Sequence, residues 1–285
     1  MHMQSPEPRS GFVIVNGIRM HYLEWGGDGP PILIVHATGF LGRIYRPIAE
    51  PLTAIGRVVS FDQRGHGDSG RALDGDYGWD RSVADLQGLI EALGLEGVRA
   101  LGHSAGATAI GALASDRPDL IARAVLIEPV IFEPETQVSQ DRQNMLYERT
   151  VRRKRSFEGV DAMYRNFENK PPYDTWRRDI LRDYCEFGTR PGPEGGRELK
   201  CPPEIEAAFY QRARDFDGLG RILEAAARML VMFGERSDSP GITLADKLAA
   251  RLGSNRIVRF PDAGHFLPME QPAEVARLAI DFFNE

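Results

Sequence analysis

The chain has 285 residues, of which 42% are hydrophobic and 27% charged, and its formal net charge is −6. This composition is typical of a globular protein with a buried core, and the negative charge argues against general nucleic-acid binding, which requires a basic surface. No segment reaches the roughly 18 consecutive apolar residues of a membrane-spanning helix. The two cysteines, Cys185 and Cys201, form no disulfide framework, so we expect a cytoplasmic protein. They also lack metal-binding spacing, and we expect no metal or other cofactor.

The first part of the chain is predicted to form a hairpin. The segment FVIVNGIRMHYLEWG, residues 12–26, contains two β-prone runs joined by Asn16 and Gly17. An Asn-Gly pair adopts positive φ angles at low cost and favours a tight turn. We therefore expect an antiparallel pair of strands.

Further along, short apolar runs bounded by turn residues have the pattern of strands buried on both faces, at 31–37, 57–62, 98–103, 123–128, 229–234 and 256–261. Helix-sized segments accompany them at 44–54, 79–93, 104–116, 243–252 and 272–284. Strands that alternate with helices form parallel β-α-β units. The predicted fold class is therefore α/β, with a doubly wound and mostly parallel sheet.

The interval 130–227 interrupts this alternation. Within it, apolar side chains at helical spacing predict an amphipathic helix through Trp176, Ile180, Leu181, Tyr184 and Phe187. Residues 188–203, rich in Gly and Pro, are expected to form a loop or hinge. We interpret residues 1–129 and 228–285 as two parts of one α/β core, and the interval between them as an inserted helical domain.

The pentapeptide GHSAG, residues 102–106, stands between the predicted strand at 98–103 and an Ala-rich helical segment. The G-x-S-x-G pattern at such a junction is typical of a nucleophile elbow, a strained turn that raises a serine hydroxyl above the end of a sheet. We predict that Ser104 is a catalytic nucleophile rather than a turn residue.

A serine hydroxyl is a poor nucleophile until a base takes its proton. Among the six histidines, His265 follows the last predicted strand in a Gly-containing loop, whereas the others lie in the hairpin, at the N-terminus, or before the nucleophile. We predict that His265 is the base.

The third residue of such a site is a carboxylate that fixes the imidazole tautomer. Asp238 follows the strand before the histidine strand and gives the chain order Ser, Asp, His, so it is our first choice. Glu128 is the alternative, because it ends the strand predicted at 123–128, and Pro129 is expected to keep it extended. Glu235 and Asp262 are interpreted as exposed loop charges.

The oxyanion that forms during attack on a carbonyl requires N–H donors. The residue after the nucleophile, Ala105, is expected to supply one of them, and the loop at 36–40 to supply the other.

Four segments together resemble the α/β-hydrolase superfamily: HATGF (36–40), FDQRGHGDSG (61–70), GHSAG (102–106) and PDAGHFLPMEQP (261–272). They are similar to the family's oxyanion loop, Asp-x-Arg-Gly-x-Gly-x-Ser turn, nucleophile elbow and histidine loop. The resemblance covers essentially the whole chain except the insertion. It implies a serine hydrolase with a triad of Ser104, His265 and Asp238. It also implies that the oxyanion hole is formed by the N–H groups of Thr38 and Ala105, and that the insertion is a cap.

The sequence departs from the family pattern at two places. Ala37 stands where glycine is usual, and the loop that contains Asp238 is one residue longer than the common Gly-x-x-Asp form. Some relatives, such as zearalenone lactone hydrolases, carry the acid at the position that matches Glu128. Both carboxylates therefore remain candidates.

A serine at the elbow excludes the epoxide hydrolase and haloalkane dehalogenase branches, which use aspartate there. The expected substrate pocket is apolar and is formed by Phe40, Leu41, Tyr45, Val130, Ile131, Phe132, Phe266 and Leu267. Such a pocket suits an uncharged substrate. We expect a hydrolase of a small, largely apolar carboxylic ester or lactone, acting as a monomer or homodimer. The alternatives are a C–C bond hydrolase, a perhydrolase or haloperoxidase-like enzyme, and a ligand-binding receptor with vestigial turnover.

Other polar residues are interpreted as structural. His36, His103 and Asp62 lie at strand ends inside family motifs, where architectural hydrogen bonding is the commoner role. The basic run RTVRRKR, residues 149–155, is interpreted as a solvated helix face, with an anionic substrate or a membrane surface as the alternative partner.

Overall fold

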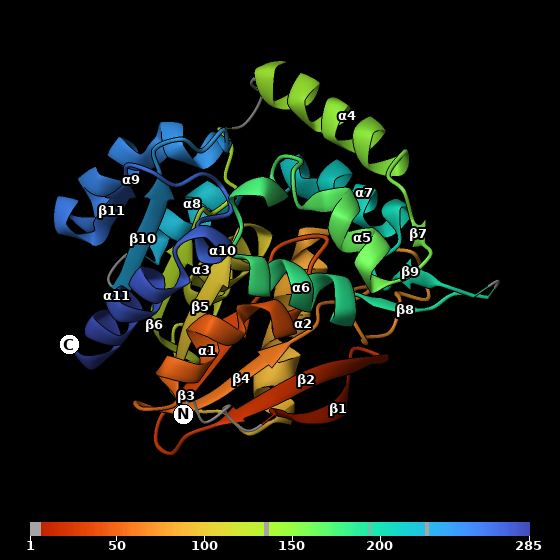
Figure 1. Cartoon of the computed structure of the whole chain (residues 1–285). Helices are drawn as coiled ribbons and strands as arrows, with labels where there is room; N and C mark the ends of the chain where they lie inside the picture. Colours follow the sequence, from red (N-terminus) through yellow and green to blue (C-terminus); the bar gives the residue numbers. More distant parts are fainter. Residues whose placement is uncertain (1–6, 134–136, 194, 226–227) are drawn as a thin grey trace.

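The computed structural model describes residues 7–133, 137–193, 195–225 and 228–285. Its centre is an eight-stranded sheet with the order β1-β2-β4-β3-β5-β6-β10-β11. The strands are β1 (Arg9–Val15), β2 (Ile18–Gly26), β3 (Pro31–Val35), β4 (Arg57–Phe61), β5 (Val98–His103), β6 (Ile121–Ile127), β10 (Met229–Gly234) and β11 (Ile257–Phe260). The predicted doubly wound, mostly parallel α/β sheet is confirmed (Figure 1).

The predicted hairpin forms the one antiparallel end of this sheet. β1 pairs with β2 through a turn in which Asn16 and Gly17 have φ angles of 50° and 77°. β2 runs antiparallel to β4, and the strands from β4 to β11 are parallel to one another.

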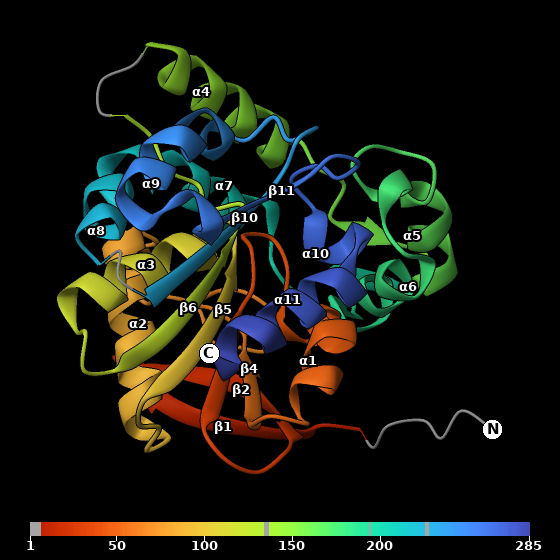
Figure 2. The same cartoon turned by 90° about the vertical axis from the view of Figure 1, so that its left-hand side faces the viewer.

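Helices cover both faces of the sheet (Figure 2). One face packs on α1 (Arg46–Leu52), α10 (Leu267–Glu270) and α11 (Pro272–Asn284). The other packs on α2 (Trp79–Ala92), α3 (Ala105–Asp116), α8 (Gly218–Glu224) and α9 (Ala245–Leu252). The core therefore consists of two apolar layers, one on each face of the sheet. The carboxyl ends of the parallel strands lie along one edge of the sheet.

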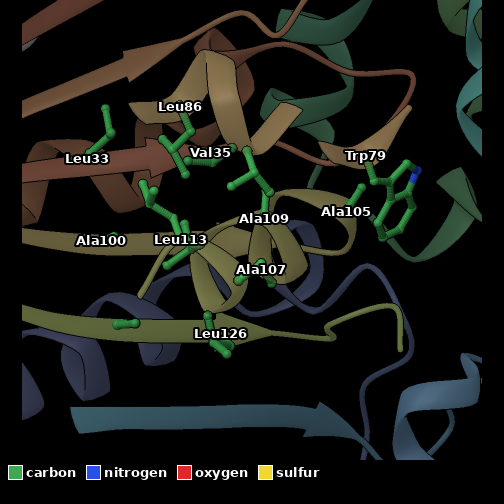
Figure 3. Packing of buried hydrophobic residues seen from close by; sticks show 14 of the residues in the cluster. Leu33, Val35, Trp79, Leu86, Ala100, Ala105, Ala107, Ala109, Leu113 and Leu126 are labelled. Atoms are coloured by element: carbon green, nitrogen blue, oxygen red, sulfur yellow. The ribbon is translucent and has the colours of Figure 1, made fainter. Parts of the chain in front are cut away.

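α3 packs closely on the sheet because its side chains are small. Ala107, Ala109 and Leu113 are buried between α2 and the strands β3, β5 and β6 (Figure 3). Gly111 allows α8 to approach from the other side, since a Cβ there would lie 2.4 Å from Ile222. The Ala-rich sequence after Ser104 thus fixes the helix that the elbow opens into.

The interval between β6 and β10 contains α4 (Gln137–Val151), β7 (Ser156–Phe157), α5 (Val160–Phe167), α6 (Arg178–Phe187), β8 (Thr189–Pro191), β9 (Arg197–Leu199), α7 (Pro203–Arg212) and α8. The predicted amphipathic helix is α6, which begins at Arg178, so Trp176 lies just before it. The stretch predicted as a loop or hinge, 188–203, instead contains β8 and β9. β9 pairs with both β7 and β8 in a small antiparallel sheet. α8 packs on α3, so the end of the interval lies against the core.

α4 lies at the outer edge of the molecule in both views and packs along α7 (Figures 1 and 2). Short 3-10 helices complete the described elements: η1 (Gly42–Tyr45), η2 (Tyr173–Thr175), η3 (Ala213–Asp215), η5 (Pro240–Leu244) and η6 (Ser254–Arg256). Within the described ranges, no helix combines the length and the apolar character that a membrane crossing requires.

Candidate active site

Ser104 occupies a strained turn between β5 and α3. Its φ and ψ angles are 57° and −122°, a conformation that L-residues rarely adopt. The neighbouring glycines allow the close packing of this turn. A Cβ at Gly106 would lie 2.5 Å from the carbonyl oxygen of Val35, and one at Gly102 would lie 2.7 Å from the backbone of Ala107. The sequence pattern and the geometry therefore agree on an elbow that holds the Ser104 hydroxyl at the end of the sheet.

His265 lies directly beside this serine. Its Nε2 atom is 3.1 Å from the Ser104 Oγ, a distance at which the hydroxyl can donate to the ring. The loop that carries His265 follows β11, and Glu270 fixes its backbone by accepting a hydrogen bond of 3.0 Å from the Gly264 N–H. The two predicted residues, which are 161 positions apart in the sequence, are thus brought into contact.

The carboxylate at the other side of the imidazole is Glu128, not the first-choice Asp238. The Glu128 Oε2 is 3.1 Å from His265 Nδ1, and the Glu128 side chain is fully buried. Asp238 is exposed on the loop after β10. The expected choice between the two acids is therefore corrected: the structure brings Ser104, His265 and Glu128 together.

The register of the parallel strands explains this arrangement. His103 pairs with Ile127, so the residues that follow them, Ser104 and Glu128, emerge side by side at the same level. Glu128 is not extended, as Pro129 had suggested, but has a φ of 51°. Its turn directs the backbone N–H to Met232 of β10, with an N to O distance of 2.8 Å.

The loop after β10 supplies hydrogen-bond donors to the acid. The Gly234 N–H donates to Glu128 Oε1 and the Ser237 hydroxyl donates to Glu128 Oε2, both at 2.6 Å. Donors of this kind stabilise and orient an ionised carboxylate. The signal that sequence reasoning undervalued was this combination: a glutamate at a strand end next to the nucleophile strand, and an acid loop of unusual length with a serine before its aspartate.

The predicted oxyanion loop presents the Thr38 N–H in a fixed direction. The Ala37 carbonyl accepts from the His36 Nδ1–H at 2.7 Å and from the Phe40 N–H at 3.2 Å. Because the C=O and N–H of a trans peptide point in opposite directions, the Thr38 N–H points away from the His36 ring. Among the described residues it meets no hydrogen-bond acceptor. Ala105, at the first position of α3, offers the second N–H that a helix leaves unpaired.

Two buried histidines, both neutral, hold this loop in place through hydrogen bonds. The Gly39 N–H donates to His66 Nε2 at 2.9 Å, while His66 Nδ1–H donates to the Arg64 carbonyl at 3.0 Å. Burial, and then the nearby His36 ring, lower the pKa of His66 to about 3. Burial also lowers the pKa of His36, whose Nε2 accepts from the Gln63 N–H at 2.9 Å. The structural interpretation of His36 from sequence agrees with these contacts.

Aromatic side chains gather between the site and the inserted segment. The Phe40 ring contacts Trp176, Tyr184 and Phe266 with centroid distances of 5.2 to 5.8 Å, and Phe266 follows His265 directly. Leu41 is buried in the same cluster, whereas Val130 and Phe132 pack on the cluster of the opposite sheet face. The indole N–H of Trp176 is buried and has no hydrogen-bond partner among the described residues.

Tyr45 was predicted to line the substrate pocket. Its side chain is buried, and its hydroxyl forms hydrogen bonds with the loop at 36–40 and with His103. It is 1% exposed, and its hydroxyl is 2.7 Å from His103 Nδ1 and accepts from the Ala37 N–H at 3.2 Å. It therefore supports the oxyanion loop rather than offering a free hydroxyl to a substrate.

The basic run 149–155 is only partly a solvated face. Arg149, Arg152, Lys154 and Arg155 are exposed, as expected, but Arg153 turns inward. Its guanidinium pairs with Glu206 at 2.5 Å and donates to the hydroxyls of Tyr173 and Tyr184. No sequence pattern indicates this cluster, because its residues come from separate segments of the chain.

Glu206 of this cluster packs against the predicted oxyanion loop at Gly39. A Cβ at Gly39, whose φ is 85°, would lie 2.8 Å from the Glu206 carboxyl carbon. The glycine therefore allows the inserted segment to pack closely on the loop, and the Arg153–Glu206 pair lies at this junction.

One group of potential metal ligands occurs in the described part of the chain: His21, Asp62 and Asp68. Asp62 already accepts from His21 Nδ1, the Gly42 N–H and the Asp68 N–H, at 2.8, 2.8 and 3.0 Å. These bonds fix the turn after β4, which is the structural role expected of Asp62. The hydrogen bonds of His265 with Ser104 and Glu128 do not involve this group.

Comparison with known proteins places the chain in a family. The family model described as "Alpha/beta hydrolase family" matches residues 32–278. The chain is 39% identical over 125 residues to N-formylmaleamate deformylase of Pseudomonas putida, a match that spans 44% of this chain and 46% of that protein. It is 25% identical over 287 residues to a bifunctional esterase/perhydrolase of Acinetobacter calcoaceticus, covering 94% and 97% of the two chains.

A solved structure shares the whole fold. The structure of E-2-(acetamidomethylene)succinate hydrolase superposes with a TM-score of 0.86 at 24% identity, and the match covers 98% of this chain and 100% of the other. This likeness extends over the inserted segment as well as the sheet. The matched family model covers most of the sheet and its helices, so this chain belongs to the alpha/beta hydrolase family.

Proposed function

We propose that the chain is a serine hydrolase that cleaves a carboxylic ester or lactone of a small, largely apolar substrate through an acyl-enzyme. The observation that carries the proposal is the unbroken line from the Ser104 hydroxyl through both ring nitrogens of His265 to Glu128, with 3.1 Å at each contact. The full-length likeness to an esterase/perhydrolase supports this reaction class.

In the proposed mechanism, Ser104 Oγ attacks the substrate carbonyl while His265 Nε2 takes its proton. Glu128 accepts from the His265 Nδ1–H, which keeps Nε2 free as the base and stabilises the imidazolium that forms. The Thr38 and Ala105 N–H groups stabilise the oxyanion. When the tetrahedral intermediate collapses, His265 returns the proton to the leaving alkoxide and the acyl group stays on Ser104.

Water then completes the reaction. It attacks the acyl-enzyme as His265 takes one of its protons, and collapse of the second tetrahedral intermediate releases the acid and restores the Ser104 hydroxyl. The aromatic cluster of Phe40, Trp176 and Phe266 favours an apolar acyl or alcohol group next to the reacting carbonyl.

Hydrolysis of an N-acyl bond is the second candidate. The observation in its favour is the match to a protein named as a deformylase of N-formylmaleamate, at higher identity than the full-length match but over less than half of either chain. The same residues would serve, with His265 protonating a leaving nitrogen instead of an oxygen.

The test compares hydrolysis of p-nitrophenyl acetate, p-nitrophenyl butyrate and p-nitroacetanilide by the wild type and by Ser104→Ala. Loss of an intact triad typically costs about 10⁶-fold in kcat. We expect ester turnover that is abolished in the variant. Comparable turnover by both proteins would refute the assignment of Ser104, and turnover of the anilide at a higher kcat/KM than either ester would favour the second candidate.

A further inference from the structure

A chain of buried hydrogen bonds joins the oxyanion loop to the base. The Ala37 N–H donates to the Tyr45 hydroxyl at 3.2 Å, and this hydroxyl lies 2.7 Å from His103 Nδ1. On the other side of the same ring, His103 Nε2 lies 2.8 Å from the backbone carbonyl of His265. Tyr45 and His103 are 1% and 0% exposed, so water does not compete for these bonds.

The position of every hydrogen in this chain follows from the partners. A backbone carbonyl only accepts, so His103 Nε2 must carry a hydrogen and donate it to His265. Burial, followed by the nearby His265 ring, holds the pKa of His103 well below its usual value, so the ring is neutral and Nδ1 has a free lone pair. The Tyr45 hydroxyl therefore donates to Nδ1 while its oxygen accepts from Ala37. Each group has one role, and no alternative arrangement satisfies all of them.

This series of hydrogen bonds adjoins all three groups of the proposed reaction: the oxyanion loop, the nucleophile and the base. Ala37 precedes Thr38, whose N–H faces the oxyanion, and His103 precedes the nucleophile Ser104. The far end of the chain is the backbone of His265. Reaction rates depend on the distance and angle between these groups, and errors of about 1 Å can cost about 10²-fold.

We propose that Tyr45 and His103 are positioning residues that hold the oxyanion loop and the base, His265, at a fixed separation across the nucleophile elbow. This inference rests on the proposed role of Ser104, because the alignment matters only if that serine reacts. Neither side chain contacts the substrate carbonyl in this scheme. They act through the backbone groups of Ala37 and His265.

The experiment measures the rate at which a fluorophosphonate labels Ser104, together with kcat and KM for p-nitrophenyl butyrate. Labelling forms an Oγ–P bond and expels fluoride, with His265 taking the serine proton, so it needs the same alignment but no particular substrate. The variants are Tyr45→Phe, His103→Leu and His103→Gln. The glutamine amide retains a donor for the His265 carbonyl, whereas leucine retains neither hydrogen bond.

Ser60→Ala is the matched control. The Ser60 hydroxyl accepts from the Trp25 indole N–H at 2.9 Å, and both side chains are buried away from the catalytic contacts. The Ser60→Ala change leaves the buried Trp25 N–H donor unpaired, and Tyr45→Phe likewise leaves the Ala37 N–H donor and the His103 Nδ1 acceptor unpaired. Thermal unfolding of all variants reports the purely structural effect.

We expect Tyr45→Phe to lower the labelling rate and kcat about tenfold, less than the 10²-fold to 10³-fold loss of a whole oxyanion donor, with KM changed less than about twofold. His103→Leu is expected to lose more than His103→Gln, and Ser60→Ala to keep wild-type labelling at a similarly lowered unfolding temperature. Labelling by Tyr45→Phe within about twofold of the wild type, or an equal loss in Ser60→Ala, would overturn the positioning role. Absence of wild-type labelling would instead refute the nucleophile itself, and labelling without ester turnover would refute only the ester substrate.

Discussion

Ser104 and Glu128 are the residues that directly follow a pair of partners in adjacent parallel strands, and both have positive φ angles, 57° and 51°. Each strand therefore ends in a sharp turn at the same level of the sheet. The first turn presents a hydroxyl and the second a carboxylate, and the imidazole of His265 lies between them. Strain at two neighbouring strand ends is expected where a geometry is maintained for chemistry.

Glu128→Ala is expected to lower kcat for p-nitrophenyl butyrate by about 10⁴-fold, because the imidazole loses the partner that fixes its tautomer and stabilises its charge. Asp238→Ala is the matched control. Its carboxylate is exposed and another group holds the His265 Nδ1, so kcat is expected to stay within about threefold of the wild type. Steady-state kinetics of both variants at pH 8 decide the question. A larger loss in Asp238→Ala would transfer the role of the acid to that loop.

Gly106→Ala is expected to destabilise the fold by about 1 to 3 kcal/mol, the usual cost of overpacking. The new Cβ would lie 2.5 Å from the Val35 carbonyl oxygen and 2.6 Å from that of His36, and neither backbone atom can move without displacing β3. Urea denaturation measures the change in the free energy of unfolding.

Gly159→Ala provides the control for this substitution. No atom lies within 4 Å of the position that its Cβ would take, and its φ of −180° is open to any residue. Because Gly159 is the N-cap of α5, where alanine is less favourable than glycine, we expect a small change, below about 1 kcal/mol. Equal effects of the two substitutions would contradict the close approach of α3 to β3.

The buried histidines should make the fold sensitive to acid. The pKa of His66 is lowered to about 3 in the folded state, against 6.5 for the free side chain, so below pH 6.5 the unfolded chain binds a proton that the folded chain does not. The stabilising contribution of neutral His66 is therefore complete above pH 6.5 and is lost progressively as the pH falls toward 3. His36 and His103 have lowered pKa values for the same reason and act in the same direction.

Measurement of the free energy of unfolding in urea at pH 7.5, 6.0 and 5.0 tests this expectation. The wild type is expected to lose stability steadily across the series. In His66→Gln, the amide oxygen can still accept from the Gly39 N–H, but one titrating group is gone, so the slope against pH should decrease by up to about 1.4 kcal/mol per pH unit. An unchanged slope would show that His66 does not contribute to the acid sensitivity.

Arg153→Gln is expected to destabilise the fold by about 2 kcal/mol, because it leaves the buried Glu206 carboxylate without its cation next to Gly39. The double variant with Glu206→Gln should recover part of this loss, since the uncompensated charge is removed. Equilibrium urea denaturation of the two single variants and the double variant gives the coupling.

A neighbouring ion pair serves as the control for burial. Arg155 pairs with Glu204 between the same two segments, but the side chains are 57% and 60% exposed. Such a pair contributes about 0 to 1 kcal/mol, so Arg155→Gln should have little effect. If both arginine substitutions cost the same, burial does not distinguish the two pairs.

Local sequence patterns were sufficient to predict the sheet, the hairpin and two of the three central side chains. The Asn16-Gly17 turn, the apolar runs and the GHSAG junction depend on short-range rules of backbone conformation and burial, which the sequence displays directly. His265 could be chosen because it is the late histidine in a loop after a strand. The strands β8 and β9 were missed because their Gly-rich and Pro-rich sequence has no apolar alternation.

The identity of the acid beside His265 was decided only by tertiary structure. Both Asp238 and Glu128 follow core strands, and the sequence cannot show that the turn at Glu128 brings its carboxylate under the imidazole while Ser237 and Gly234 donate to it. The inward turn of Arg153 and the link from Tyr45 through His103 to His265 are likewise contacts between distant segments. Such contacts depend on strand register, turn direction and packing distance to within an ångström, and these are properties of the assembled molecule rather than of any short stretch of its chain.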